Sequence, residues 1–142
     1  MPQARKTSTG RRAPARIVDG EALNPVWSPG GDLIVYAGAQ VKSIAPLLAV
    51  RPDGDSVELP EIAVLRAGER MRFLPDGSSL VYMQGLQPSQ DFWRLDLATM
   101  TSRRLTQLDP TTTMRTFDIT PDGQRIVFDR LSLDSDIVLI ER

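Results

Sequence analysis

The sequence contains no cysteine and no histidine, and only 6% of its 142 residues are aromatic. Without cysteine the chain can form no disulfide and has no thiolate chemistry. Without histidine it has no Ser-His-Asp or Cys-His catalytic set, no zinc site of the usual ligand types and no imidazole acting as general base near neutral pH. We therefore expect no catalytic residue, no metal and no cofactor in this chain.

Long apolar runs are also missing. No apolar stretch approaches 18 residues, and none lies near Met1, so the sequence predicts neither a membrane-spanning helix nor a secretory signal. As written, the chain would stay in the cytoplasm, and a periplasmic location stays open if it is a fragment of a longer protein. Its length fits one domain.

One turn is written three times in the sequence. Pro29-Gly30-Gly31, Pro75-Asp76-Gly77 and Pro121-Asp122-Gly123 stand 46 residues apart, and a fixed period in the 40s is typical of repeat folds. Proline presets φ at the first corner, the aspartates accept hydrogen bonds from the backbone ahead of them, and the last glycine supplies a positive φ. These residues need no ligand to explain them.

Short runs of β-branched and aromatic residues surround each turn and predict four antiparallel strands per repeat. The predicted strands contain Trp27, Phe73 and Ile119 (first strands), Ile34–Tyr36, Leu80–Tyr82 and Ile126–Phe128 (second), Leu47–Val50, Phe92–Leu95 and Ile137–Ile140 (third), and Val57–Leu59 and Arg103–Leu105 (fourth). Four such strands make one propeller blade, so the sequence predicts an all-β propeller segment of about three blades.

The aromatic residues of this repeat are expected to fill apolar layers between the blades. They are Trp27, Tyr36, Phe73, Tyr82, Trp93, Phe117 and Phe128. If Phe73 fills such a layer, its truncation to alanine should cost about 3–5 kcal/mol.

The repeat also predicts the domain boundaries. Residues 1–10 are expected to be a flexible basic arm, and residues 11–142 the propeller segment, with blades at about 19–64, 65–110 and 111–142. The last blade lacks a fourth strand, which residues 11–18 would supply. Because known propellers have about 4 to 8 blades, three outcomes stay open: a fragment missing upstream blades, two copies forming a six-bladed homodimer, or an open arc with exposed edges.

Charge is uneven along the chain. Residues 1–16 carry a charge of +5, and the remainder carries −6. A basic arm is typical of binding to nucleic acid or to an acidic membrane. Arg11 and Arg12 align with an exposed outer strand, however, and the acidic remainder would repel phosphate. We therefore expect no nucleic-acid partner and no membrane insertion.

Several motifs resemble one family. Trp27–Gly31, followed by Leu33–Tyr36, is similar to the Trp-Ser-Pro-Asp-Gly motif that opens blades in TolB-type, WD-repeat-like propellers, and the resemblance covers residues 23–142. It is strong in Phe73–Gly77 and Gln90–Leu97 as well, and the C-terminal end resembles the last blades of propellers in large bacterial proteins, including some serine/threonine kinases. The resemblance implies a ring of six or more blades, a protein-binding or sensing role and a bacterial source. Gly30 departs from the motif aspartate, and the chain contains no kinase motif.

Function is expected in loops that break the repetition, on the ring face where each blade's first strand begins. The candidate binding residues are Asn24, Glu69, Arg70 and Arg115, together with Lys42, Gln87, Gln90 and Asp134 from the loops between second and third strands. Asp91 and Asp136 repeat across blades and are expected to be structural, and Arg72 and Asp118 are expected to form an ion pair between blades.

Two functions fit these predictions. The first is a non-catalytic binding or scaffold module that presents propeller-face loops to a protein or peptide. The alternative is an accessory propeller that senses or gates for a larger bacterial enzyme, a serine/threonine kinase or a peptidase, whose catalytic domain is not in this chain.

Overall fold

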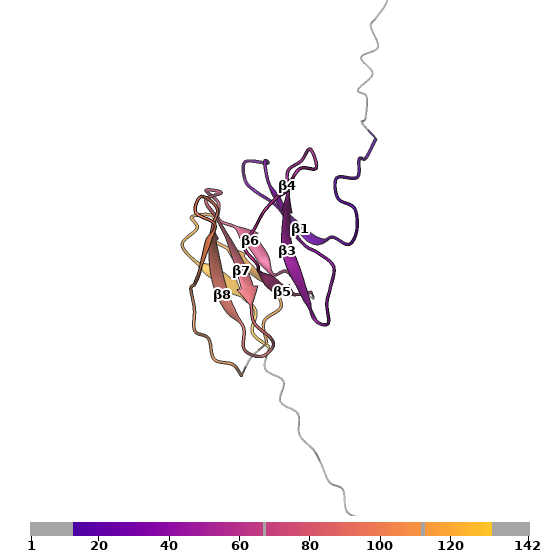
Figure 1. The fold of residues 1–142 in the computed structure, drawn as a ribbon. Helices are drawn as coiled ribbons and strands as arrows, with labels where there is room; N and C mark the ends of the chain where they lie inside the picture. Colours follow the sequence, from indigo (N-terminus) through magenta and orange to yellow (C-terminus); the bar gives the residue numbers. More distant parts are fainter. Residues whose placement is uncertain (1–12, 67, 112, 132–142) are drawn as a thin grey trace, which may run out of the picture.

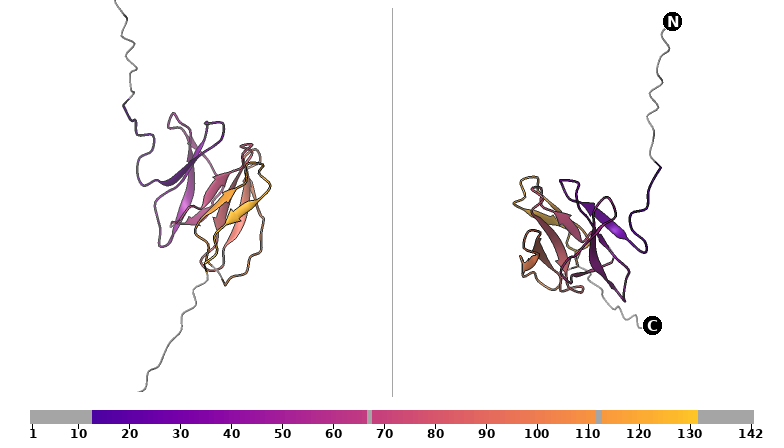
Figure 2. Two further views of the ribbon diagram at one scale, coloured as in Figure 1. Left: turned by 180° about the vertical axis from the view of Figure 1, so that it is seen from behind. Right: turned by 45° about the horizontal axis from the view of Figure 1, so that its top comes forward.

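Three antiparallel sheets follow one another along the chain and stand side by side (Figures 1 and 2). The structure is a computed structural model that describes residues 13–66, 68–111 and 113–131. These residues form strands and turns, and none of them belongs to a helix that could cross a membrane. The predicted all-β architecture of propeller blades is confirmed.

The first blade has five strands, which are β1 (Leu23–Trp27), β2 (Ile34–Ala37), β3 (Ile44–Val50), β4 (Ser56–Val57) and β5 (Ala63–Leu65). The first four are paired in chain order, and β5 pairs with the beginning of β3 while β4 pairs with its end. The outer strand of this blade is therefore split. Val57–Leu59 was predicted as one strand, but pairing stops at Val57 and resumes only after Pro60, which has no N–H to donate.

The second blade is a four-stranded meander of β6 (Met71–Phe73), β7 (Ser79–Gln84), β8 (Asp91–Asp96) and β9 (Thr101–Arg104). The third consists of β10 (Phe117–Ile119) and β11 (Ile126–Phe128). The predicted first, second and third strands coincide with these elements wherever the structure describes them, and Ile137–Ile140 lies outside the described residues.

The three repeated turns have the predicted geometry. Gly31, Gly77 and Gly123 have φ angles of 73°, 74° and 72°, which residues other than glycine rarely adopt. Asp76 Oδ1 accepts a hydrogen bond from Ser78 N at 2.9 Å, and Asp122 Oδ1 accepts one from Gln124 N at 3.0 Å. The turns thus use their aspartates for structure.

The first turn has Gly30 in place of this aspartate and uses another carboxylate. Ser28 Oγ donates to Asp32 Oδ1 at 2.8 Å and accepts a hydrogen bond from Leu33 N at 3.0 Å. Asp32 and Ser28 together therefore close this turn in place of the missing motif aspartate.

Two apolar cores lie between the blades. The core between the first and second blades contains Val35, Leu47, Val64, Leu80 and Tyr82, among others. The core between the second and third blades centres on Phe92, whose ring lies 5.0 Å from that of Phe117 and 5.2 Å from that of Phe128, centroid to centroid. Of the predicted core aromatics, Tyr36, Tyr82 and Phe117 are buried, and Phe73, Trp93 and Phe128 are half-buried.

Trp27 contradicts the prediction, because its side chain is 57% exposed. Its neighbour Val26 packs against the first core, and successive residues of a strand point to opposite faces. Trp27 therefore lies on the face of the first blade that is turned away from the second blade, where no described blade covers it.

The N-terminal segment lies against this same face. Residues 13–18 form no strand, although residues 11–18 were predicted to supply one. Val18 packs instead on a small cluster of Ile34, Tyr36 and Val50.

Candidate functional site

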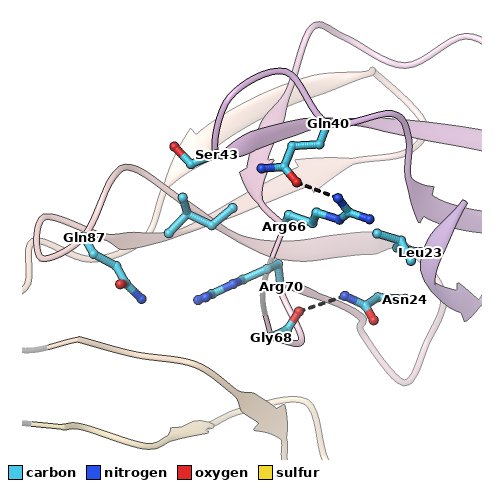
Figure 3. Close-up of a pocket in the computed structure, with 9 residues that line it drawn as sticks. Leu23, Asn24, Gln40, Ser43, Arg66, Gly68, Arg70 and Gln87 are labelled. Carbon is cyan, nitrogen blue, oxygen red and sulfur yellow. Dashed lines mark hydrogen bonds between the residues drawn. The ribbon is translucent and has the colours of Figure 1, made fainter. Parts of the chain in front are cut away.

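A pocket of about 560 Å³ opens between the first two blades, at the end where β1 and β6 begin (Figure 3). Its walls come from the start of β1, the β2–β3 loop, the segment from β5 to β6 and the β7–β8 loop. The lining residues are three amides (Asn24, Gln40, Gln87), two arginines (Arg66, Arg70), and Leu23, Ser43, Leu65 and Gly68. The pocket is thus a cleft whose polar groups are amides and guanidinium groups, while most of its exposed wall is apolar.

Asn24 connects the two blades at the back of this pocket. Its backbone has a φ of 50°, at an irregularity in the pairing of β1 with β2, and its Nδ2 donates to the carbonyl of Gly68 at 2.9 Å. Gly68 has a φ of 88°, and a Cβ at this position would lie 2.3 Å from the carbonyl oxygen of Arg115. Only glycine fits here, because the chain approaches the third blade so closely.

Arg66 is the accessible cation of the pocket, and its side chain is 43% exposed. Its Nη1 donates to Gln40 Oε1 at 2.7 Å, and its Nη2 forms an ion pair with Glu21. Figure 3 shows the Arg66 and Gln40 side chains meeting over the pocket. One edge of the Arg66 guanidinium can therefore bind a carboxylate, because it already binds that of Glu21.

Arg70 lines the pocket but is only 1% exposed. Its Nη1 donates to the carbonyl of Met114 at 2.8 Å, which links the start of β6 to the segment before β10. Burial lowers the pKa of Arg70, and the charge of Asp129 opposes this effect. Arg70 therefore contributes positive charge to the pocket wall while its guanidinium holds two blades together.

Gln87 faces this wall from the β7–β8 loop and points toward Arg70 (Figure 3). It is exposed, and its side chain makes no hydrogen bond within the described part of the chain. Its amide is thus available to a bound molecule.

The other predicted site residues lie apart from this pocket. Glu69 accepts a hydrogen bond from Thr116 Oγ1 at 2.8 Å and pairs with Arg72 at 2.5 Å, and these two contacts lower its pKa. It lines a shallower hollow of about 410 Å³ beside the third blade. Arg115 is exposed nearby, with its backbone N–H donating to Asp129.

Lys42 and Gln90 lie at opposite extremes of exposure. Lys42 is exposed next to the pocket and accepts a hydrogen bond from Gln40 through its carbonyl. Gln90 is 2% exposed, and neither amide atom has a hydrogen-bond partner among the residues the structure describes. Its side chain offers no surface contact. Asp134 lies outside the described residues.

Six lining residues were not predicted as site residues: Leu23, Gln40, Ser43, Leu65, Arg66 and Gly68. Leu23 precedes the predicted Asn24, and Gln40 and Ser43 flank the predicted Lys42. Leu65 ends β5, a strand that was not predicted, and Arg66 and Gly68 follow it. The short apolar run Ile62–Leu65, which contains the β-branched residues Ile62 and Val64, is a strand signal in the sequence. Recognising it would have located the loop that carries Arg66 and Gly68.

The acidic groups away from the pocket are structural, as predicted for Asp91. Its Oδ1 accepts hydrogen bonds from Leu108 N at 2.8 Å and from Thr106 Oγ1 at 2.9 Å, and its Oδ2 pairs with Arg104. Burial acts to raise the pKa of Asp91, but these bonds outweigh it and lower the pKa.

The predicted ion pair between the second and third blades is also present. Arg72 Nε and Asp118 Oδ1 are 3.8 Å apart. Across residues 13–66, 68–111 and 113–131, no group of three or more acidic side chains gathers in a way that could hold a metal ion.

Comparison with known proteins identifies the fold. No family model and no curated protein matches the chain. Among solved structures, a protein assigned as a TolB from Agrobacterium tumefaciens superposes with a TM-score of 0.63 at 19% identity, over 84% of this chain and 42% of that protein. The chain has a TolB-like β-propeller fold. TolB from Acinetobacter baumannii gives a TM-score of 0.55 at 23% identity, over 77% of this chain and 26% of its own.

A TolB-like fold also occurs within a larger enzyme in this comparison. Acylaminoacyl peptidase from Pyrococcus horikoshii superposes with a TM-score of 0.55 at 17% identity, over 84% of this chain and 19% of the peptidase. This chain thus spans less than half the length of each of the three structures. At these identities the similarity shows the fold alone.

Proposed function

We propose that this chain is a non-catalytic binding module that takes a segment of a protein or peptide partner in the pocket between its first two blades. The observation that supports this proposal is the composition of the pocket. Amide groups present both donors and acceptors, which suits the backbone of an extended peptide, and no acid–base pair lines the pocket.

The charge of the pocket favours a partner segment with a carboxylate. Both ionisable side chains of the lining, Arg66 and Arg70, are cationic. Arginine presents a planar fork that matches a carboxylate, and Glu21 already occupies one edge of Arg66. A partner carboxylate would replace Glu21 or share the guanidinium with it.

Peptide display tests this proposal. Random heptapeptides displayed on phage would be selected on the whole chain, and the selected peptides would be synthesised and titrated against variants. We expect them to be rich in Asp or Glu and to lose about 10- to 100-fold in affinity for Arg66→Ala, since a hydrogen bond to a charged group is worth about 1.5–3 kcal/mol. Gln87→Ala should also weaken them.

Arg103→Ala is the matched control, because Arg103 is an exposed arginine on β9, away from the pocket. It should leave the affinity unchanged. Selected peptides that bind Arg66→Ala and Gln87→Ala as tightly as the original chain would refute a peptide site in this pocket.

A second function is supported by the peptidase comparison, in which this chain superposes on 19% of a larger enzyme. In that case the chain would be an accessory propeller that senses or gates for a catalytic domain. Sequencing the genomic region on both sides of the coding segment tests it. A hydrolase or kinase domain joined in frame would support this function, and separate flanking genes would contradict it.

A further inference from the structure

Each end of the three-blade arc presents a sheet face that no described blade covers. One is the first-blade face, which carries Trp27 and Leu48, 57% and 42% exposed. The other is the third-blade face, on the side of β10 and β11 that carries Asp118 and Val127. Val35, Val81 and Val127 occupy equivalent positions of the repeat and are 0%, 1% and 62% exposed. Val127 is therefore at a core position of the repeat, and no blade among the described residues neighbours it.

The first-blade face matches a face that is already buried elsewhere in the chain. Strand pairing aligns Trp27 with Ile34 and Val50, and Tyr36 with Leu48. The same pairing in the second blade aligns Phe73 with Leu80 and Leu95, and Tyr82 with Trp93. That row of the second blade packs into the core against the first blade. The first-blade face thus has the side chains needed to pack against a blade in front of it.

The glycines of the repeated turns also indicate that, among the described residues, a blade is missing in front of the first blade. A Cβ placed on Gly77 would lie 3.6 Å from Pro29 Cδ, and one placed on Gly123 would lie 3.4 Å from Pro75 Cδ. Gly77 and Gly123 therefore each lie close to the turn proline of the preceding blade. Gly31 has nothing within 4 Å of the same position, and Pro121 is the turn proline of the last described blade. A closed junction would bring Pro121 to Gly31.

The N-terminal segment is already placed for such a junction. Val64 precedes Phe73 by nine residues and packs between the first and second blades. Val18 precedes Trp27 by the same nine residues and packs on Ile34, Tyr36 and Val50. Val18 thus occupies the position that the outer strand of a preceding blade occupies in the next repeat, and leaves the Trp27 side chain exposed.

We propose that a second copy of this chain covers both faces, with the first-blade face of each copy packed on the third-blade face of the other. The chain forms this type of junction twice within itself, and both halves of it stand exposed on the same molecule. Two such contacts related by a twofold axis give a ring of six blades, which is within the range of about 4 to 8 that propellers use. This interface does not depend on the proposed binding function.

Light scattering on the whole chain tests the interface. We expect a particle of twice 15.7 kDa. Trp27→Asp and Val127→Asp should each raise the dissociation constant at least 100-fold and yield a monomer, because each change places a carboxylate in both junctions of the ring. Leu86→Asp is the matched control: Leu86 is 60% exposed in the β7–β8 loop, away from both faces, and the variant should remain a dimer.

Folding is checked separately by far-UV circular dichroism and urea denaturation, which should show that the two monomeric variants keep the β structure. A wild-type chain that stays at 15.7 kDa at all concentrations would overturn the proposal and assign the faces to blades outside this chain. A dimer that only one of the two face variants dissociates would also overturn it.

Cross-linking tests the expected contact between Pro121 and Gly31. The chain has no cysteine, so Gly30→Cys and Pro121→Cys each create a unique thiol. Asp76 occupies the position of Gly30 in the second blade, and a Cβ on Gly30 would meet only the end of the Asp32 side chain, 3.3 Å from its Oδ1. When the two variants are mixed and treated with a short bismaleimide, links between 30 and 121 should predominate. Predominant 30–30 or 121–121 links would overturn the head-to-tail arrangement.

Discussion

Phe92 should be the single side chain whose loss most weakens the contact between the second and third blades. It is fully buried, and its ring packs edge-on to Phe117 and at an angle to Phe128. Truncation of a buried phenylalanine costs about 3–5 kcal/mol. Each aromatic pair accounts for about 0.5–1.5 kcal/mol beyond area burial, so we expect Phe92→Ala to fall in the upper half of that range.

Urea denaturation followed by tryptophan fluorescence measures this loss. With an m value of about 2 kcal/mol/M for a chain of this size, a loss of 4 kcal/mol lowers the midpoint by about 2 M. Domains of this size have about 5–15 kcal/mol of stability in total, so Phe92→Leu is included as a variant that keeps most of the apolar volume. It should lose about 1–2 kcal/mol, chiefly the aromatic contacts.

Leu86→Ala is the control for this series, because a side chain that is 60% exposed should change stability by less than about 0.5 kcal/mol. A loss below 1 kcal/mol for Phe92→Ala, with an unchanged m value, would refute the conclusion that Phe92 joins the two blades. It would mean that the third blade adds little to the stability of the second.

Two further changes test the turns and loops that hold the blades. Asp91→Asn should lower the free energy of unfolding by about 1.5–3 kcal/mol at pH 7, since it weakens hydrogen bonds to a charged group. Folding lowers the pKa of Asp91, so its carboxylate stabilises the folded chain fully at pH values above the ordinary aspartate pKa of about 3.9. This stabilisation is lost as the pH falls below that value. Between pH 7 and pH 2.5 the urea midpoint of the variant should therefore fall less steeply than that of the original chain, and parallel curves would contradict this. Gly68→Ala should cost more than Gly20→Ala, although both have positive φ, because only at Gly68 would the new Cβ lie 2.3 Å from a carbonyl oxygen. Thermal melts of both variants compare the two losses, and equal losses would show that Arg115 moves aside.

The sequence predicts local structure well wherever a short segment determines it. The turns at Pro29, Pro75 and Pro121 follow from proline and glycine chemistry within four residues, and their φ angles are as predicted. The predicted aspartate hydrogen bonds are present in the turns at Pro75 and Pro121. The same holds for the strands on either side of each turn. The split outer strand of the first blade was missed, because its second half, β5, pairs through only three residues with β3.

Burial at the blade junctions was harder to predict, because it depends on neighbours far away in the sequence. Trp27 and Phe73 occupy the same repeat position, yet Trp27 is exposed and Phe73 is half-buried, since within the described part of the chain a blade lies in front of Phe73 and none in front of Trp27. Arg70 was predicted as a binding residue in a loop. It is buried instead, and its guanidinium donates a hydrogen bond to the carbonyl of Met114, 44 residues away. Nothing in the residues next to Arg70 indicates that contact.

The pocket and the two open faces belong to different junctions of the same arc. The pocket is formed entirely within one chain, where Asn24 in the first blade donates to Gly68 just before the second, so its shape does not require a second copy. Trp27 and Val127 line no part of it. The monomeric face variants should therefore keep an intact pocket, because the contacts that shape it lie between the first two blades and the proposed ring would close at other junctions.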